Sequence, residues 1–242
     1  MIPATPSTVG HGDGSSGGRI DLFAGCGAAD MEEITASARI LRKERGEFVY
    51  MSGERADAVY VLRKGRIKLS VLSESAREFT IDIIQSGEIF GEFALIDESE
   101  RSNMAQAVDD AVMWMFGKRD FLRVLVKQAA LNLNYIRLVG DRRRRMEKKL
   151  SDITAKDVWA RVCELLHDYS TSAAAVSPTH DLVVPLTHQD VANLIGTSRQ
   201  TTTTFLNVLE RRGVIELGRG WIRVKHLEHL QPYAGSAAVD AL

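Results

Sequence analysis

The 242-residue sequence predicts an α+β fold, in which a β-rich N-terminal domain precedes a long helix and a compact helical C-terminal domain. Short runs of alternating polar and apolar residues, separated by glycines, fill residues 40–116. A heptad pattern then follows, and residues 187–226 combine two short helices with a hairpin. We expect a disordered tail at 1–20, the β-rich domain at 21–125, the long helix with a hinge at 126–168, and the C-terminal domain at 169–242.

Composition limits the classes of function. Hydrophobic residues make up 45% of the chain and charged residues 26%, as in a globular protein, and the formal net charge is −1. Cys26 and Cys163 are the only cysteines, which excludes a four-cysteine zinc site or a cysteine-ligated iron–sulfur cluster. No apolar run approaches the roughly 20 residues of a membrane span. The first residues are rich in Gly, Ser, Thr and Pro and lack the apolar core of a signal peptide, so we expect a disordered tail on a cytoplasmic protein.

Residues 40–116 are expected to form a sandwich or barrel of short strands. A short helix between Asp21 and about Ala38 precedes them, with Met31 and Ile34 at helical spacing. Alternation is clearest in VYVLRKGRIKLSVLS and EFTIDIIQSGEIFGEF. The glycines between strands are expected at turns that need positive φ: Gly46, Gly53, Gly65, Gly87 and Gly91.

The long helix carries an apolar seam. Lys118 to His167 contains no proline and only one glycine, Gly140. Such a seam needs a partner, either its own domain or the same helix of a second chain. Arg143 within the seam is costly unless an anionic group meets it. The seam residues fall at alternating steps of three and four: Ile136, Val139, Arg143, Met146, Leu150 and Ile153.

The C-terminal domain has the order of a winged helix-turn-helix. A linker-like stretch, Ser170 to His180, comes first. Thr187 then caps a helix that stops at Gly196, and Thr197 or Ser198 starts a second helix that stops at Gly213. A two-stranded hairpin turning at residues 218–220 completes the motif.

The second of these helices has the chemistry of a DNA-reading helix. Arg suits guanine edges, Gln suits adenine, and a threonine methyl suits the thymine methyl, while the helix amino end suits phosphate. Residues 187–226 carry six Lys and Arg against three Asp and Glu, so this part is locally basic. The alternative is a solvated helix, although the four threonines Thr201–Thr204 weaken an exposed helix. The candidate DNA-binding residues are Thr187, Ser198, Arg199, Gln200, Thr201, Thr203, Thr204 and Arg219.

The stretch GEFALIDESERSN, from Gly91 to Asn103, places a carboxylate and an Arg-Ser pair around an apolar segment. One reading is a surface helix with ordinary ion pairs. The other is a small pocket in which Glu92 binds a sugar hydroxyl while Arg101 and Ser102 bind a phosphate.

These motifs together resemble the CRP/FNR family of bacterial transcription regulators. The resemblance extends from Leu22 to about Leu230 and rests on GEFALIDESERSN, on DVWAR at 157–161, and on LTHQDVANLIGTSRQTTTTFLNVLERRGVI at 186–215. It implies a cyclic-nucleotide-binding-type β-roll, a dimerisation helix and a winged helix-turn-helix. It also implies a homodimer on pseudo-palindromic double-stranded DNA, with RNA polymerase as a further partner.

The resemblance assigns roles to the pocket residues. Gly91 would allow close approach, Glu92 would bind the ribose hydroxyl, and Arg101 with Ser102 would hold the cyclic phosphate. On the long helix, Arg142 aligns with an arginine that helps at the pocket. Met146 and Glu147 stand where cyclic-AMP-binding members have a Thr-Ser pair that contacts adenine. The candidate ligand-binding residues are Gly91, Glu92, Arg101, Ser102, Arg142, Arg143 and Met146.

This departure leaves three explanations open: another mononucleotide, a more anionic ligand such as a cyclic dinucleotide, or a vestigial pocket that binds no effector. The run Arg142–Arg145 is either part of the site or a solvated flank of the helix. In the recognition helix Arg199 matches the family, whereas Gln200 replaces a frequent Glu, so we expect a different operator sequence.

Two hypotheses of regulation follow. In the first, an anionic ligand in the β-roll sets DNA affinity. In the second, the dimer is always competent, and control comes through abundance, a partner protein or phosphorylation of the Ser- and Thr-rich tail. Catalysis and a metal site are not expected, since no carboxylate pair, nucleophile–histidine arrangement or metal-ligand spacing is evident and His167, His180 and His188 are scattered.

Overall fold

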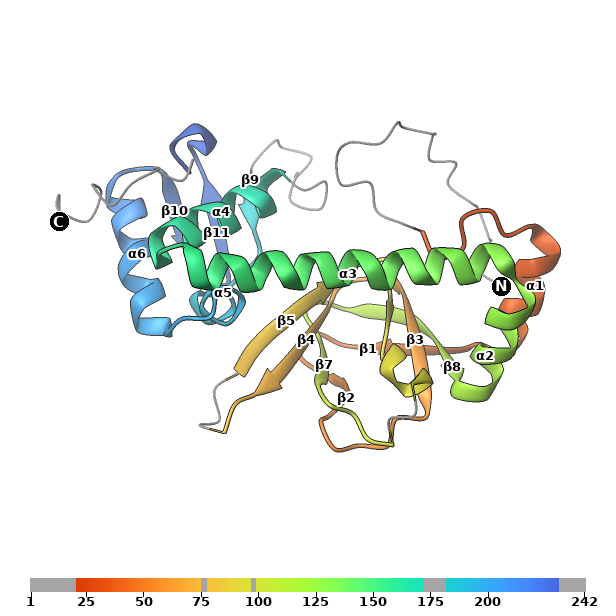
Figure 1. The fold of residues 1–242 in the computed structure, drawn as a ribbon. Helices are drawn as coiled ribbons and strands as arrows, with labels where there is room; N and C mark the ends of the chain where they lie inside the picture. The colour runs from red at the N-terminus through yellow and green to blue at the C-terminus, as the bar shows by residue number, and fades with distance from the viewer. Residues whose placement is uncertain (1–20, 75–77, 97–98, 172–181, 231–242) are drawn as a thin grey trace.

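The computed structural model describes residues 21–74, 78–96, 99–171 and 182–230. The expected tail at 1–20 and most of the expected linker, residues 172–180, lie outside these ranges. Figure 1 shows one long helix, α3 (Ala129–Ala155), running along the molecule, with the β-rich domain against one side and the C-terminal domain at its end. The α+β class and the order of the parts are those that the sequence predicted.

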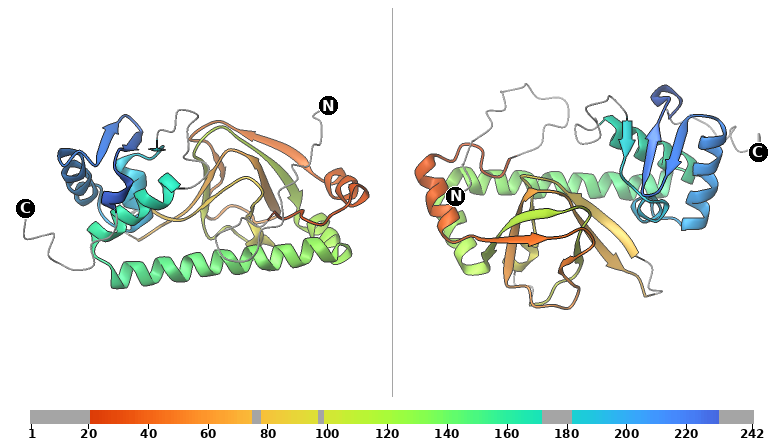
Figure 2. Two further views of the ribbon diagram at one scale, coloured as in Figure 1. Left: turned by 90° about the horizontal axis from the view of Figure 1, so that it is seen from above. Right: turned by 180° about the vertical axis from the view of Figure 1, so that it is seen from behind.

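The N-terminal domain is a β-roll of two four-stranded antiparallel sheets, in the orders β1-β8-β3-β6 and β2-β7-β4-β5. The sheets enclose apolar side chains, while α1 (Ala28–Ala36) and α2 (Lys118–Lys127) cover one end, as Figure 2 shows from two sides. The strands are β1 (Arg39–Lys43), β2 (Phe48–Tyr50), β3 (Ala58–Lys64), β4 (Ile67–Leu72), β5 (Glu78–Ile84), β6 (Ile89–Phe90), β7 (Met104–Ala107) and β8 (Ala111–Gly117), and the turn η1 (Glu92–Leu95) follows β6.

The turns of the β-roll depend on glycine, as expected. All five predicted turn glycines have positive φ. Gly65 is the most constrained, because a Cβ there would lie 2.6 Å from the carbonyl oxygen of Asp110. Any residue with a Cβ at position 65 would therefore require the backbone to move.

The expected helical segment at 126–168 is divided. Helix α3 ends at Ala155, Lys156 has extended backbone, and α4 (Val158–Thr171) starts a new direction. Helix α4 contributes Val162 and Leu166 to the core of the C-terminal domain. We therefore propose a domain boundary near Asp157 rather than after residue 168.

Helix α3 has two distinct faces. One face, with Leu131, Asn134, Leu138 and Arg142, is buried against the N-terminal domain. The heptad seam lies largely on the other face, where Ile136, Val139, Met146 and Leu150 remain 39–66% exposed. The N-terminal domain therefore does not cover the seam.

The C-terminal domain is a winged helix-turn-helix. Thr187 caps α5 (His188–Ile195) by accepting from the Asp190 amide, and Gly196 ends that helix at a φ of 70°. Ser198 caps α6 (Arg199–Arg211), so the two predicted helices and their signals are confirmed. The strands β10 (Ile215–Gly218) and β11 (Trp221–Val224) form the expected hairpin, and the turn η2 (Leu227–Leu230) follows.

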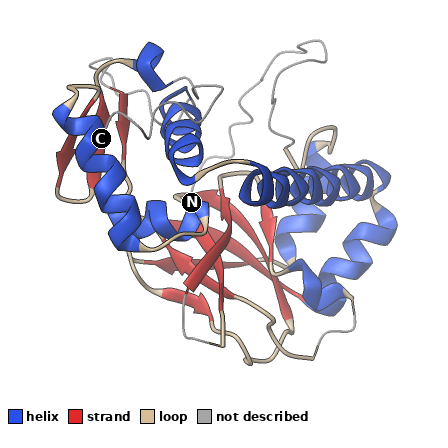
Figure 3. Ribbon diagram, turned by 60° about the vertical axis from the view of Figure 1, so that its left-hand side comes forward, coloured by secondary structure: helices blue, strands red, loops and turns tan. Residues whose placement is uncertain are grey.

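A third strand, β9 (Leu182–Val184), pairs with β11 and was not predicted. Figure 3 shows this small sheet beside the helices of the domain. Three residues are too few for an alternating pattern, and the pairing partner lies about forty positions further along the chain.

Candidate functional site

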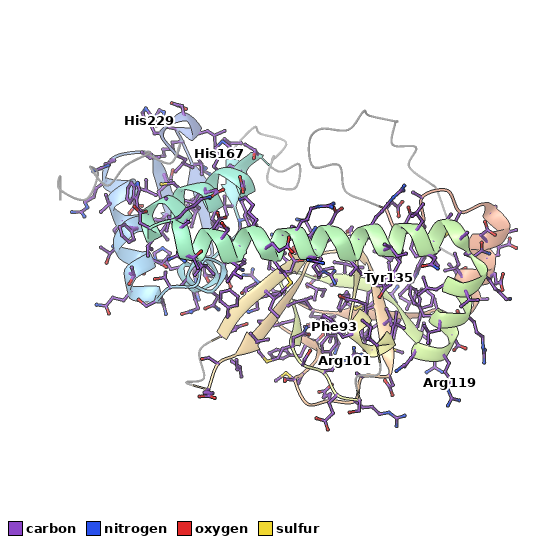
Figure 4. All side chains as sticks on the ribbon, viewed as in Figure 1. Phe93, Arg101, Arg119, Tyr135, His167 and His229 are labelled. Atoms are coloured by element: carbon purple, nitrogen blue, oxygen red, sulfur yellow. The ribbon has the colours of Figure 1, made fainter. Side chains whose placement is uncertain are left out.

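Arg101 is buried in the β-roll, and no negatively charged partner lies among the residues that the structure describes. The residue is 5% exposed and donates to the carbonyl oxygens of Gly91 (2.9 Å) and Ala58 (2.6 Å). Its guanidinium lies 4.3 Å from the centre of the Tyr50 ring. Among the described residues, no carboxylate forms an ion pair with it, and its Nε has no hydrogen-bond partner. Figure 4 shows Arg101 in the β-roll, away from α3.

Gly91 makes room for this guanidinium. Its φ is 71°, and a Cβ there would lie 2.9 Å from Arg101 Nη1 and 3.1 Å from the Tyr60 ring. The family resemblance implied that Gly91 allows close approach of a ligand. In the structure, the group that approaches it is Arg101 itself.

Aromatic rings form the apolar wall beside Arg101. Tyr60 stacks on Phe90 with ring centres 5.0 Å apart, and the Tyr50 hydroxyl donates to Asn103 Oδ1 over 3.1 Å. Burial raises the pKa of both tyrosines, and the charge of Arg101 opposes the rise. The neighbouring Ser102, the second predicted phosphate ligand, is exposed. A neutral wall of this kind does not neutralise the buried charge.

Glu92 and Arg142, predicted from distant parts of the sequence, form a buried ion pair. Arg142 Nη1 lies 2.5 Å from Glu92 Oε1, and Nη2 donates to the Ile89 carbonyl. Burial lowers the pKa of Arg142, but the ion pair with Glu92 outweighs this, so the net shift is upward. The predicted ribose-binding carboxylate is thereby held by α3.

Two other predicted ligand residues lie elsewhere in this chain. Arg143, whose side chain is 80% exposed, pairs with Glu147 on its own helix over 2.8 Å, and this carboxylate is the anion that the seam position required. Met146 lies on the exposed seam. The structure therefore brings Glu92 to Arg142 and Gly91 to Arg101, and leaves Arg143 and Met146 on another face of α3.

The ion-pair network continues onto β5. Arg142 Nε lies 3.5 Å from Asp82, and Arg145 contacts both Asp82 (2.9 Å) and Glu88 (3.2 Å). Lys149, one turn further along α3, donates to the Thr80 carbonyl. Sequence reasoning missed these partners because they lie on β5 and in the turn after it, about sixty residues away along the chain. The run Arg142–Arg145 is thus only partly a solvated flank.

Strand β5 also contacts the C-terminal domain. Asn193 of α5 donates to Glu78 over 3.1 Å, and a Cβ on Gly196 would lie 3.2 Å from the Phe79 ring. A cavity of about 660 Å³ adjoins this contact, lined by β5, α3, α4 and α5. We call these contacts of β5 with α3 and α5 the β5 bridge. One strand therefore links the Glu92–Arg142 pair to the helix-turn-helix.

The recognition helix α6 presents a different surface. Arg199, Gln200 and Thr204 are exposed at or near its amino end, and Arg219 is exposed at the tip of the hairpin. Thr202 is fully buried, so the four-threonine run divides between the core and the surface. The helix is anchored from behind by Leu206 and Leu209.

Several predicted DNA-binding hydroxyls already have partners. Ser198 Oγ caps the Thr201 amide and lies 2.8 Å from the Thr201 hydroxyl. Thr203 Oγ1 lies 3.0 Å from His188 Nδ1, and burial, with the charge of Arg199, lowers the pKa of that histidine. Thr187 bonds Asp190. These groups fix the two helices, which leaves Arg199 and Gln200 as the exposed donors of the first turn.

Both halves of the chain match known protein families. Residues 40–128 match the cyclic nucleotide-binding domain, and residues 160–233 match the Crp-like helix-turn-helix domain. The chain belongs to the CRP/FNR family of transcription regulators. It is a DNA-binding regulator of this family, and its relatives are regulators rather than enzymes, as the sequence indicated.

Relatives in other bacteria cover most of the chain. The cyclic AMP receptor protein of Thermus thermophilus is 27% identical over 190 residues, which are 78% of this chain and 85% of that protein. The CRP-like cAMP-activated global transcriptional regulator of Mycobacterium tuberculosis is 27% identical over 218 residues, 88% of this chain and 95% of the relative.

Solved structures share the fold. The c-di-GMP-responsive global regulator CLP of Xanthomonas campestris superposes with a TM-score of 0.75 at 21% identity, over 82% of this chain and 99% of that one. A CRP/FNR-family regulator from Thermus thermophilus gives 0.69 at 21% identity, over 79% and 96%. Within the described part of this chain, no helix is both long and apolar enough to cross a membrane.

Proposed function

We propose that the protein is a homodimeric, sequence-specific transcription regulator whose affinity for DNA is set by an anionic ligand in the β-roll. One observation supports the anionic ligand. Arg101 is a buried guanidinium whose described contacts are neutral carbonyls and aromatic rings. A buried cation is unfavourable until an anion pairs with it, and a guanidinium suits the paired oxygens of a phosphate.

The ligand class that fits is a cyclic nucleotide. Arg101 and Ser102 would bind its phosphate and Glu92 its ribose hydroxyl. The relatives named above support this class, since the names of two refer to cyclic AMP and the name of one refers to cyclic di-GMP. Met146 and Glu147 replace the hydroxyl pair expected for adenine, so the base and the choice between mononucleotide and dinucleotide stay open.

The exposed seam of α3 supports the dimer. Ile136 and Leu150 are 60% and 66% exposed on a heptad pattern, which is the surface that a second copy of the same helix covers. Two recognition helices about 34 Å apart would then meet a pseudo-palindrome. Arg199, Gln200 and Thr204 would read bases, while Ser198, Thr201, Thr203, Thr187 and Arg219 would contact or position phosphates. Such a regulator would work in the cytoplasm, with RNA polymerase as its partner.

The β5 bridge is the element through which the ligand would act. A ligand shifts an equilibrium only by binding one arrangement more tightly than the other. A sugar hydroxyl on Glu92 would share that carboxylate with Arg142, which also contacts Asp82 of β5. At the hinge, Lys156 bridges Asp152 of α3 and Glu164 of α4 (2.7 and 2.5 Å). The winged domain would turn about this junction when β5 releases α5.

A regulator that needs no ligand is the second candidate. The observation in its favour is that Arg101 already donates two hydrogen bonds to backbone carbonyls. Control would then come from abundance, a partner protein or phosphorylation of the tail.

Thermal unfolding distinguishes the two. The purified protein is heated with cyclic AMP, cyclic GMP, cyclic di-GMP, cyclic di-AMP or buffer. A ligand of the folded state stabilises it by about 2.7 kcal/mol at a hundredfold excess over its dissociation constant. We expect one nucleotide to raise the midpoint in the wild type and in the control Arg119→Ala, on the exposed face of α2, but not in Arg101→Ala. No shift with any nucleotide would favour the ligand-independent regulator.

A further inference from the structure

Three potential metal ligands meet in the turn that follows the wing. His226, Glu228 and His229 each offer one donor atom, and these atoms all lie within 4.8 Å of one another. Sequence reasoning missed this group because only His167, His180 and His188 were weighed as possible ligands. The signal was the spacing His-x-Glu-His after a predicted strand.

The helical geometry of the turn places the two imidazoles together. Residues 227–230 form the 3₁₀ turn η2, which has three residues per turn, so side chains at i and i+3 lie on the same side. The rings of His226 and His229 have centres 5.4 Å apart and an interplanar angle of 30°. His226 Nδ1 lies 3.1 Å from Glu228 Oε1.

The backbone beneath these side chains is fixed to the core. Leu230 is fully buried in the winged domain, and Leu227 packs against the same cluster. The amide of His226 donates to the Val214 carbonyl (3.2 Å), and the amide of His229 to the His226 carbonyl (3.2 Å). The three donors therefore start from a common rigid base, which lowers the entropy lost on binding an ion.

We propose that His226, Glu228 and His229 bind one divalent transition-metal ion of the zinc, nickel and copper class. Two imidazole nitrogens and one carboxylate oxygen suit these ions, and three protein ligands leave room for water. Bond lengths of about 2.0–2.2 Å require the donors to approach to roughly 3.4 Å, which small side-chain rotations supply.

Binding requires a free lone pair on each imidazole. His226 Nδ1 lies 3.1 Å from Glu228 Oε1, and for Nδ1 to bind an ion the neutral ring must hold its proton on Nε2. Metal binding must consequently weaken in acid, where imidazole is protonated.

The site is separate from the β-roll. Figure 4 shows His229 at the outer edge of the winged domain, on the side away from the β-roll. His226 follows the last wing residue, Val224, by two positions, so a bound ion ties the end of β11 to η2. The ion therefore stabilises the winged domain whether or not a nucleotide is bound.

Titration of the tag-free, reduced protein with Co²⁺ and then Zn²⁺ tests the site. We expect absorption bands of bound Co²⁺ that Zn²⁺ removes at one equivalent per chain, and a higher unfolding midpoint with Zn²⁺. Single variants His226→Gln and His229→Gln should each weaken Zn²⁺ binding at least tenfold, whereas the control His167→Gln on α4 should bind as the wild type does. Binding at about pH 5 should be weaker than at about pH 7.5.

Two results would overturn the proposal. One is no Zn²⁺ binding by the wild type at a tenfold molar excess. The other is equal binding by the wild type, His226→Gln and His229→Gln, which would place the ion on other residues.

Discussion

Two arginines of this protein, Arg101 and Arg199, lie in opposite surroundings. Arg101 is 5% exposed and bonds two backbone carbonyls, whereas Arg199 is exposed at the amino end of α6. Within the described residues, the side chain of Arg199 has no hydrogen bond or ion pair. The β-roll buries the charge of Arg101 and satisfies it in part, whereas the winged domain leaves the side chains of Arg199 and Gln200 exposed to solvent. Substitutions of buried charges in the β-roll should therefore change both the free energy of unfolding and ligand binding. Substitutions of exposed donors in the winged domain should change DNA binding and leave the free energy of unfolding as it is.

Arg142 should give the largest effect on stability. Replacing it in Arg142→Ala leaves the carboxylate of Glu92 buried and unpaired, which costs about 3–5 kcal/mol of unfolding free energy. Urea denaturation measures this. Arg199→Ala is the matched substitution on the surface and should change stability by less than about 0.5 kcal/mol. Similar losses in the two variants would remove the contrast.

Lys149 should make the free energy of unfolding depend on pH in the alkaline range. Burial lowers its pKa from 10.5 to about 8. Between these values the unfolded chain holds a proton that the folded chain has lost, so stability rises with pH, by up to about 3 kcal/mol. Denaturation of wild type and Lys149→Met between about pH 7 and 10.5 measures the effect. The variant should lack this rise, and an identical rise in both proteins would assign it to other groups.

Replacing Arg199 should weaken DNA binding and leave the free energy of unfolding nearly unchanged. Arg199→Ala should cost about 1–3 kcal/mol of specific binding and relax discrimination between operator and random DNA. Fluorescence anisotropy with both duplexes measures it. Arg39→Ala, on the exposed edge of the β-roll, is the control and should bind as the wild type does. Unchanged discrimination in Arg199→Ala would contradict the assignment of this helix.

Gly91 offers the smallest and most closely controlled comparison. Gly91 and Gly213 have similar φ values, 71° and 74°, but a Cβ at 213 would meet nothing within 4 Å. Gly213→Ala should therefore show the backbone cost alone, about 1–2 kcal/mol. Gly91→Ala should cost about 1–2 kcal/mol more, because its Cβ meets Arg101 and Tyr60. Denaturation curves that coincide would show that Arg101 and Tyr60 move aside for the added Cβ at no cost in stability.

The parts that were predicted from sequence depend on local signals. Thr187 and Ser198 mark helix starts, Gly196 and Gly213 follow helix ends, and the turn at residues 218–220 identifies the hairpin, because each acts within a few residues. The families of both domains follow from these short motifs, and the comparisons confirm them.

What the sequence could not give depends on contacts between distant segments. The positions of Arg142 and Arg145 on α3 follow from a run of four arginines, but their pairing with Asp82 and Glu88 depends on how α3 crosses β5. The placement of α4 in the winged core has the same cause, since its apolar face suits either domain. The direction of Arg101, inward onto carbonyls, is likewise set by the packing of the rings around it.

A DNA titration tests directly whether the buried Arg101 of the β-roll controls the affinity of the winged domain for its operator. An operator duplex selected from random DNA is titrated with wild type and Arg101→Ala, each with cyclic AMP, cyclic GMP or cyclic di-GMP, or with no nucleotide. We expect one nucleotide to change the dissociation constant of the wild type for the operator at least tenfold and to leave that of Arg101→Ala unchanged. An operator affinity that is the same with every nucleotide, or a change that persists in Arg101→Ala, would contradict control through the buried arginine.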